Sequence, residues 1–288
     1  MKYKILFFAI FVLFTAMKSD IEAFKLYNAK GKDVKYAKMI NELSKADIVF
    51  FGELHNNPIS HWFELEITKS LFDVKKDKLV LGAEMFESDN QLLVNEFLSS
   101  TIKRNNFEAE AKLWPNYSTD YKPLMEFAKE NNLKFVATNI PRRYAALVNK
   151  KGFEGLDSLS NDAKKLIVPL PVDYDPDVNC YKSMIEMMGG MGGHVTANIP
   201  KAQAIKDATM AYFILQNWEK GDLFLHYNGS YHSDNHEGIV WWLKQANPEL
   251  NILTVTTVEQ DTIQPLSEDY KNSADFVIAV PSDMTKTY

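Results

Sequence analysis

The stretch that most constrains the fold is ADIVFFGELHNN, residues 46–57, in which an apolar run leads directly into a polar cluster. Residues 48–51 are consecutive β-branched and aromatic side chains, a pattern typical of a parallel strand that is covered on both faces. The glycine that follows lets the backbone turn or approach a ligand closely. Glu53 and His55 fall where this strand ends, and open parallel sheets bind their ligands at that end of the strands.

Strand-like and helix-like segments alternate along the rest of the chain. Apolar runs of strand length occupy residues 48–51, 78–84, 133–139, 222–227, 251–258 and 275–280. Helical patterns fill the intervals at residues 60–72, 90–103, 121–130, 201–218 and 237–245. This alternation predicts an α/β fold with a mostly parallel sheet that is flanked by helices and connected by right-handed crossovers.

One interval is too long for a single crossover. More than eighty residues separate the third predicted strand, 133–139, from the fourth, 222–227, whereas a crossover needs only a dozen or so. We therefore expect a helical cap at about residues 150–200, inserted between the third and fourth strands. The rest of residues 24–288 is expected to form one α/β domain.

The first residues are typical of a secretory leader. Lys2 and Lys4 precede an apolar segment, residues 5–16, that is too short for a membrane span of roughly 20 residues. We expect residues 1–23 to be a signal peptide and the mature protein to be exported, either periplasmic or secreted; an uncleaved anchor is the alternative. The single cysteine, Cys180, excludes an internal disulfide and leaves no lipid-anchor cysteine after the leader.

The overall charge restricts the partners. The formal net charge is -6 at pH 7, with 24% charged and 46% hydrophobic residues. A net negative charge provides no basic surface that could bind the phosphate backbone of a nucleic acid, so we expect no nucleic-acid partner.

Polar side chains that carry chemistry collect at the predicted strand ends. Glu53 and His55 follow the first strand, Glu84 ends the second, and His232 follows the fourth. In a parallel sheet these groups converge on one edge. Any one of them could instead be an ordinary cap or turn former.

The spacing of these residues is more informative than their types. Residues 52–55 and 229–232 are both Gly-x-x-His segments placed directly after apolar strands. Two imidazoles with Glu53 and Glu84 form a nitrogen and oxygen set suited to a divalent metal, or to general acid-base catalysis. On the helix at residues 201–218, Gln203 and Asp207 lie one turn apart and could either orient a histidine or form a solvated face.

At these motifs the chain resembles the ChaN-like haem-binding proteins of the Tiki and erythromycin-esterase superfamily. The matching stretches are FFGELHNNPISH at 50–61, LGAEMFE at 81–87, ATNIPRR at 137–143 and AQAIKDATMA at 202–211. The resemblance implies haem as cofactor, a tyrosine ligand at a homodimer interface, and a role in iron acquisition with an outer-membrane haem uptake system. It also implies that Glu53, His55, Glu84 and His232 are the positions that hydrolytic relatives use, some with a metal.

The expected cap offers groups that suit haem. Haem needs an apolar slot, an axial ligand and donors for its propionates, and phenolate is a recognised ligand. Tyr181 is therefore expected to ligate the iron, with Tyr174 in reserve, and His194 and Lys182 are expected near the propionates. Four methionines at 184, 187, 188 and 191 add apolar surface, although their spacing also fits one ordinary buried helix face.

Two functions of different classes follow. The first is an exported haem-binding protein that pairs as a homodimer across its cap. The second is a hydrolase that uses Glu53, His55, Glu84 and His232 with or without a metal. Haemin added to the purified protein separates the two by its absorbance.

Overall fold

The protein is described by a computed structural model that covers residues 22–189 and 198–288. All but the last two residues of the predicted leader, 1–23, lie outside this range, as does His194. The helices are α2 (Tyr36–Leu43), α3 (Pro58–Lys75), α4 (Gln91–Leu98), α5 (Arg104–Glu110), α6 (Lys122–Glu130), α7 (Arg142–Lys151), α8 (Asn161–Lys164), α9 (Asn179–Gly189), α10 (Ile199–Asn217) and α11 (Ile239–Ala246). Within the described ranges, no helix has the length and apolar content needed to cross a membrane.

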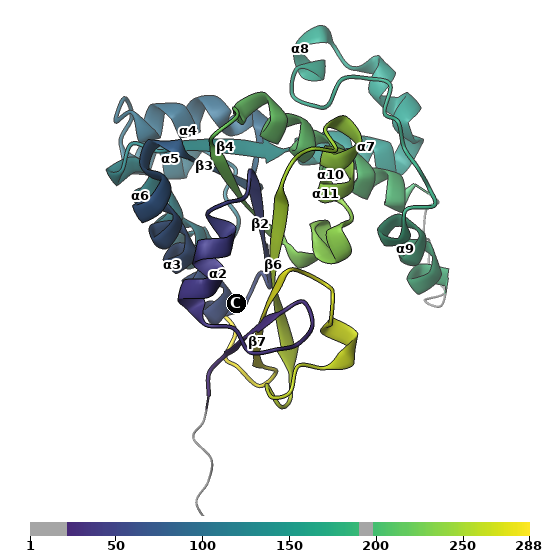
Figure 1. The fold of residues 1–288 in the computed structure, drawn as a ribbon. Helices are drawn as coiled ribbons and strands as arrows, with labels where there is room; N and C mark the ends of the chain where they lie inside the picture. The colour runs from purple at the N-terminus through teal and green to yellow at the C-terminus, as the bar shows by residue number, and fades with distance from the viewer. Residues whose placement is uncertain (1–21, 190–197) are drawn as a thin grey trace, which may run out of the picture.

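A single seven-stranded sheet runs through the centre of the molecule (Figure 1). Its strands, in spatial order, are β1 (Lys25–Asn28), β7 (Phe276–Pro281), β6 (Ile252–Gln260), β2 (Ile48–Glu53), β5 (Leu223–Gly229), β3 (Leu79–Glu87) and β4 (Lys134–Asn139). All neighbours are parallel except β1, which pairs antiparallel with β7. The predicted α/β class and mostly parallel sheet are confirmed, while the short edge strand β1 was not predicted.

Helices cover both faces of the sheet. Val49 and Phe51 of β2 pack in a core formed with α2 to α6. Ile48 and Phe50 point to the opposite face and pack against α10 and α11. The two groups of helices are seen on either side of the sheet in Figure 1. This two-sided burial explains why β2 is a continuous apolar run instead of an alternating one.

The strand order places the two Gly-x-x-His segments side by side. β5 inserts between β2 and β3, although it follows both in the chain. In this register Glu53, the second residue of the first motif, pairs with Gly229, the first residue of the second. The carboxyl ends of β2, β3 and β5 therefore form one continuous edge.

The connection between β4 and β5 is helical, as predicted. It contains α7, the short 3-10 helix η5 (Phe153–Ser158), α8, α9 and α10. The part that corresponds to the expected cap packs on α10, where Tyr181 meets Ala204 and Leu156 meets Ile205. Figure 1 shows α8 and α9 at the periphery, beyond α7 and α10.

Candidate functional site

A cavity of about 720 Å³ opens at the carboxyl edge of β2, β3 and β5. This is where an open parallel sheet is expected to bind a ligand, and the volume is within the usual range of small-molecule sites. Its walls come from the strand ends, from the loop after α5 and from α7 and α10. Described residues of the expected cap, 150–189 and 198–200, do not line it, so this part of the cap does not form a wall of the cavity.

The end of β2 fixes the orientation of His55. Glu53 is 1% exposed, and its Oε1 accepts hydrogen bonds from Nδ1 of His55 and from the hydroxyl of Tyr121, both at 2.6 Å. The imidazole also lies edge-on to Trp114, with ring centres 5.0 Å apart. The His55 side chain is 38% exposed, so its Nε2 remains available at the cavity.

Gly229 leaves the space that the His55 ring occupies. A Cβ at this position would lie 2.8 Å from both Cε1 and Nε2 of His55 and 3.6 Å from Oε2 of Glu84. The first distance is shorter than atoms can tolerate. The glycine of the second Gly-x-x-His segment therefore permits the histidine of the first to reach over the strand.

The second cluster holds His232 between two carboxylates. Its Nε2 lies 3.2 Å from Oε1 of Glu84, and its Nδ1 makes a short hydrogen bond to Oδ1 of Asp207. The other oxygen of Glu84 accepts the backbone N–H of Gly229 at 2.9 Å. Gln203 lies 3.1 Å from the same ring. Of the two residues that could orient a histidine, Asp207 does so through its bond to Nδ1 of His232.

Charge in this cluster favours an imidazolium. Burial would lower the pKa of His232, but the carboxylates of Glu84 and Asp207 outweigh it and raise that pKa to about 10. Burial would likewise raise the pKa of Glu84, yet the positive His232 holds it well below its usual value. With both ring nitrogens protonated, His232 has no lone pair for a metal.

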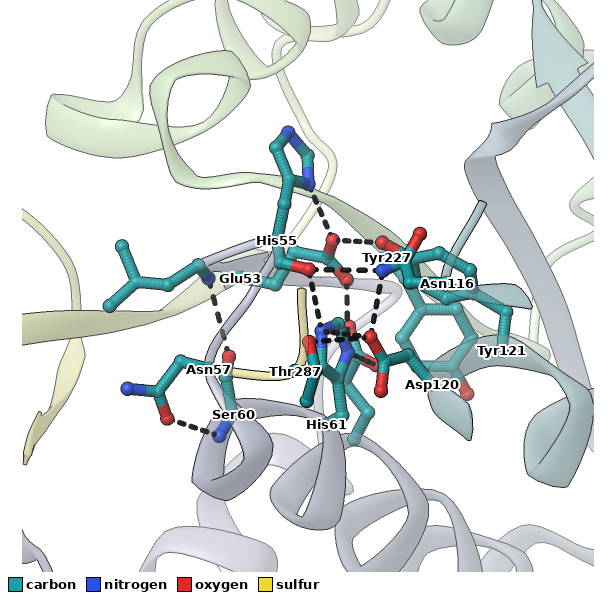
Figure 2. A network of polar contacts seen from close by, with 12 residues as sticks. Glu53, His55, Asn57, Ser60, His61, Asn116, Asp120, Tyr121, Tyr227 and Thr287 are labelled. Atoms are coloured by element: carbon teal, nitrogen blue, oxygen red, sulfur yellow. Dashed lines mark hydrogen bonds and ion pairs between the residues drawn. The ribbon is translucent and has the colours of Figure 1, made fainter. Parts of the chain in front are cut away.

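Below His55 lies a buried polar network, shown in Figure 2. His61 and Glu64, on the inward face of α3, are 7% and 0% exposed, and His61 Nδ1 lies 3.0 Å from Glu64 Oε2. Burial, and then the charge of Glu64, raise the pKa of Glu53 to about 8. Burial also raises the pKa of Glu64 to about 8.

Three cationic side chains line the cavity. Lys112 pairs with Glu87 and is thereby neutralised. Arg142 at the start of α7 and Lys206 on α10 also line the cavity. Neither forms an ion pair with another residue in the described part of the chain. The cavity thus presents two cations to an anionic ligand.

The structure brings Glu53, His55, Glu84 and His232 into one cavity, as predicted. It does not bring them into one coordination sphere. In the described ranges, the set whose potential ligand atoms all lie within 4.8 Å of one another is Glu53, His61 and Glu64. The predicted four-residue metal site is therefore corrected, because Glu84 and Asp207 occupy both nitrogens of His232.

The haem residues predicted in the cap are placed elsewhere. Tyr181 is fully buried; its hydroxyl donates to Asp207 at 2.8 Å and accepts from the indole N–H of Trp242 at 2.9 Å. Its predicted role as the iron ligand is at odds with this geometry, because the hydroxyl is buried and has two partners. Tyr174 is half-buried against the ring of Tyr181, Lys182 is exposed, and neither lines the cavity. His194 lies outside the described residues.

Several residues of the site were not predicted. His61, Glu64 and Tyr121 were not among the predicted site residues. The i,i+3 spacing of His61 and Glu64, directly after the first Gly-x-x-His segment, is the signal that could have found the first two. Tyr121 reaches Glu53 from sixty-eight residues away, and no local pattern indicates that contact.

Comparisons with known proteins agree with the fold and the motifs. Residues 39–243 match the family model described as haem-binding uptake, Tiki superfamily, ChaN. A solved structure, described as cofacial haem binding to ChaN of Campylobacter jejuni, aligns with a TM-score of 0.67 and 19% identity, covering 90% of this chain and 97% of that one. At this identity the likeness concerns the fold alone.

A plant relative matches over a shorter length. The protein RETICULATA-RELATED 5, chloroplastic, of Arabidopsis thaliana is 29% identical over 147 residues, which is 49% of this chain. The chain spans 19% of the length of that relative.

Proposed function

Because this chain belongs to the haem-binding uptake family ChaN of the Tiki superfamily, we propose that it binds haem in the cavity at the carboxyl edge of β2, β3 and β5. One observation carries the proposal: a single cavity combines a carboxylate-held histidine with two cations that form no ion pair in the described residues. These are the groups that an iron centre and two propionates require.

The lining suits the porphyrin as well as its charged edge. Apolar and aromatic side chains line the cavity together with the polar groups, and they are Leu54, Leu113, Trp114, Ile140, Ala145 and Tyr231. Arg142 and Lys206 would hold the propionates, since guanidinium and ammonium groups pair with carboxylates. Haem bound here supplies an iron centre that is carried as cargo.

His55 is the proposed iron ligand. Its Nδ1 is bonded to Glu53, and a carboxylate on one ring nitrogen orients the other for a metal. Burial would lower the pKa of His55, but the bond with Glu53 outweighs this and raises it. Because ligation needs an unprotonated Nε2, haem affinity should weaken in acid. Tyr231, 38% exposed, is the tyrosine that lines the cavity in the described ranges and is the phenolate alternative.

Haemin titration with matched variants tests this assignment. His55→Ala should lower haemin affinity by at least about 100-fold, a typical scale for disturbing a metal ligand, and change the ligand-sensitive absorbance bands. His236→Ala, which alters an exposed histidine, should titrate like the parent. If Tyr231→Phe changes the spectrum while His55→Ala does not, the ligand is the phenolate. Failure of the parent to bind haemin saturably contradicts the function itself.

The wider role rests on the N-terminal segment and the family. We infer export to the periplasm or beyond, haem transfer in iron acquisition with an outer-membrane uptake system, and pairing as a homodimer. The basic residues Lys2 and Lys4 before the apolar run at 5–16 support export. Cell fractionation with N-terminal sequencing of the mature protein tests it, and recovery of the intact N-terminus in the cytosol would contradict it. Sedimentation with and without haemin tests the dimer.

A hydrolase is the second candidate, favoured by one observation. Glu84 lies beside the imidazolium of His232 in the same cavity as the carboxylate-held His55. A protonated imidazole, His232, and a second imidazole supported by a carboxyl group, His55, in one polar cavity are parts of general acid-base catalysis. A panel of activated esters, assayed with the parent and His55→Ala, tests this function. Equal rates for both proteins would exclude His55 as the base.

A further inference from the structure

The inward face of α3 is unusual because it is polar where it packs on the sheet. Ser60, His61, Glu64 and Thr68, spaced by one, three and four residues, are all buried. The hydroxyl of Ser60 bonds that of Thr257, and the hydroxyl of Thr68 bonds that of Tyr227. Glu64 and His61 remain, and they face Glu53 at the end of β2.

Two carboxylate oxygens in this space lack hydrogen-bond partners. Glu53 Oε1 accepts from both His55 and Tyr121, but Glu53 Oε2 and Glu64 Oε1 are buried and have none in the described residues. A buried polar atom left without a partner costs about 1–3 kcal/mol, and more when it is charged. Each of the two glutamates is at most 1% exposed, so bulk water does not reach these oxygens.

The ring of His61 faces the same two carboxylates. Its Nε2 lies 3.1 Å from the carbonyl of His55 and 3.4 Å from Oδ2 of Asp120, and a carbonyl can only accept. Nε2 therefore donates its N–H to the carbonyl, and Nδ1 faces the two glutamates. Nδ1 lies 3.0 Å from Glu64 Oε2 and 3.7 Å from Glu53 Oε2. One potential ligand atom from each of the three side chains lies within 4.8 Å of the others, which is close enough to surround one metal ion.

We propose that Glu53, His61 and Glu64 bind a divalent transition metal of the Zn²⁺ class, in a buried site beneath the cavity. Imidazole nitrogen and carboxylate oxygen are both zinc ligands, and the two positive charges of the ion would neutralise both glutamates. Ligands about 2.1 Å from a tetrahedral centre lie about 3.4 Å apart, between the two separations from His61 Nδ1. The hydrogen bond from Nε2 to a backbone carbonyl is the usual support of a ligating histidine.

The site is separate from the cavity but connected to it through one residue. His61 and Glu64 do not line the cavity, whereas Glu53 does. Glu53 would bind the metal through Oε2 while Oε1 holds His55 and Tyr121. The metal is thus a positioning group for His55, and its binding does not depend on haem.

Metal analysis of the haem-free protein tests the proposal. Protein purified without chelators, loaded with Zn²⁺ and dialysed against metal-free buffer should retain about one zinc per chain. Glu64→Gln, which keeps the shape but removes a ligand charge, should bind Zn²⁺ at least about 100-fold more weakly. Glu66→Gln is the matched control on the same helix, because Glu66 makes only a surface pair with Lys69; it should bind like the parent.

Two results would overturn the site. One is a parent that retains less than about a tenth of a zinc per chain after loading, in which case protons shared among Glu53, Glu64 and His61 fill the space. The other is a folded Glu64→Gln variant with parental zinc content. Should that variant not fold, X-ray absorption at the zinc edge of the parent decides. A shell of nitrogen and oxygen with one imidazole supports the site, and a shell with sulfur or without imidazole contradicts it.

Discussion

Replacing Asp207 by asparagine removes one of the two carboxylates that hold His232 as an imidazolium. Asp207 is 1% exposed and accepts from both His232 and Tyr181. Breaking a buried pair by removal of one partner costs about 3–5 kcal/mol. Glu84 remains to neutralise His232 and asparagine keeps one acceptor, so we expect a loss near the lower limit, about 3 kcal/mol. For a chain of this size the melting temperature should fall by roughly 6–12 °C.

Urea unfolding at several pH values measures this loss. The pKa of His232 is raised from 6.5 to about 10 in the folded protein. A raised pKa stabilises the fold fully below 6.5, and that stabilisation is lost as the pH rises through 10. The difference in free energy of unfolding between the parent and Asp207→Asn should therefore be large at pH 7 and become smaller above pH 10. Asp162→Asn, at an exposed surface pair with Lys165, is the control and should change stability by less than about 0.5 kcal/mol.

The reasoning would be refuted by a small gap at neutral pH. If Asp207→Asn unfolds within about 0.5 kcal/mol of the parent at pH 7, then Asp207 is not the charge that holds His232. A gap that stays constant from pH 7 to pH 11 would show that His232 is not protonated in the folded state.

Three further predictions concern the cavity. Gly229→Ala places a Cβ 2.8 Å from the His55 ring, so haemin affinity should fall by about 10–100-fold; unchanged affinity would show that His55 does not ligate. Arg142→Gln should weaken haemin about two- to fivefold, the scale of an exposed ion pair, without altering the affinity for haemin dimethyl ester; an equal loss for both would contradict propionate binding. The pKa of Glu84 is lowered from 4.5, so ionised Glu84 stabilises the fold above pH 4.5, and this stabilisation is lost as the pH falls further. In Glu84→Gln the free energy of unfolding should therefore fall less steeply in acid than it does in the parent. An equally steep fall in both proteins would contradict the pairing with His232.

The fold was predictable where burial leaves a strong local pattern. The continuous apolar run of β2 indicates a strand covered on both faces, and the length of the interval between β4 and β5 indicates an insertion. β1 was not predicted because a strand of four residues at a sheet edge is too short to show a recognisable hydrophobic pattern. The placement of β5 between β2 and β3 depends on tertiary packing, so the sequence indicates a common edge without specifying which motifs are neighbours.

The site was predictable at the strand ends but not within the helices. Glu53, His55, Glu84 and His232 follow strands, and a parallel sheet brings such positions together. The burial of Tyr181, the predicted iron ligand, could not be predicted because it depends on how α9 packs against α10 and α11. Its partners Asp207 and Trp242 lie 26 and 61 residues away, and spacing alone does not indicate such contacts.

The position of iron in crystals of the haemin complex tests the central claim most directly. Anomalous scattering at the iron edge locates the metal without reference to the porphyrin density. The account predicts an iron peak within bonding distance of His55 Nε2, inside the cavity at the ends of β2, β3 and β5. An iron peak on the outer surface of α9, beside Tyr174 and Lys182, would contradict it and return the haem site to the segment between β4 and β5.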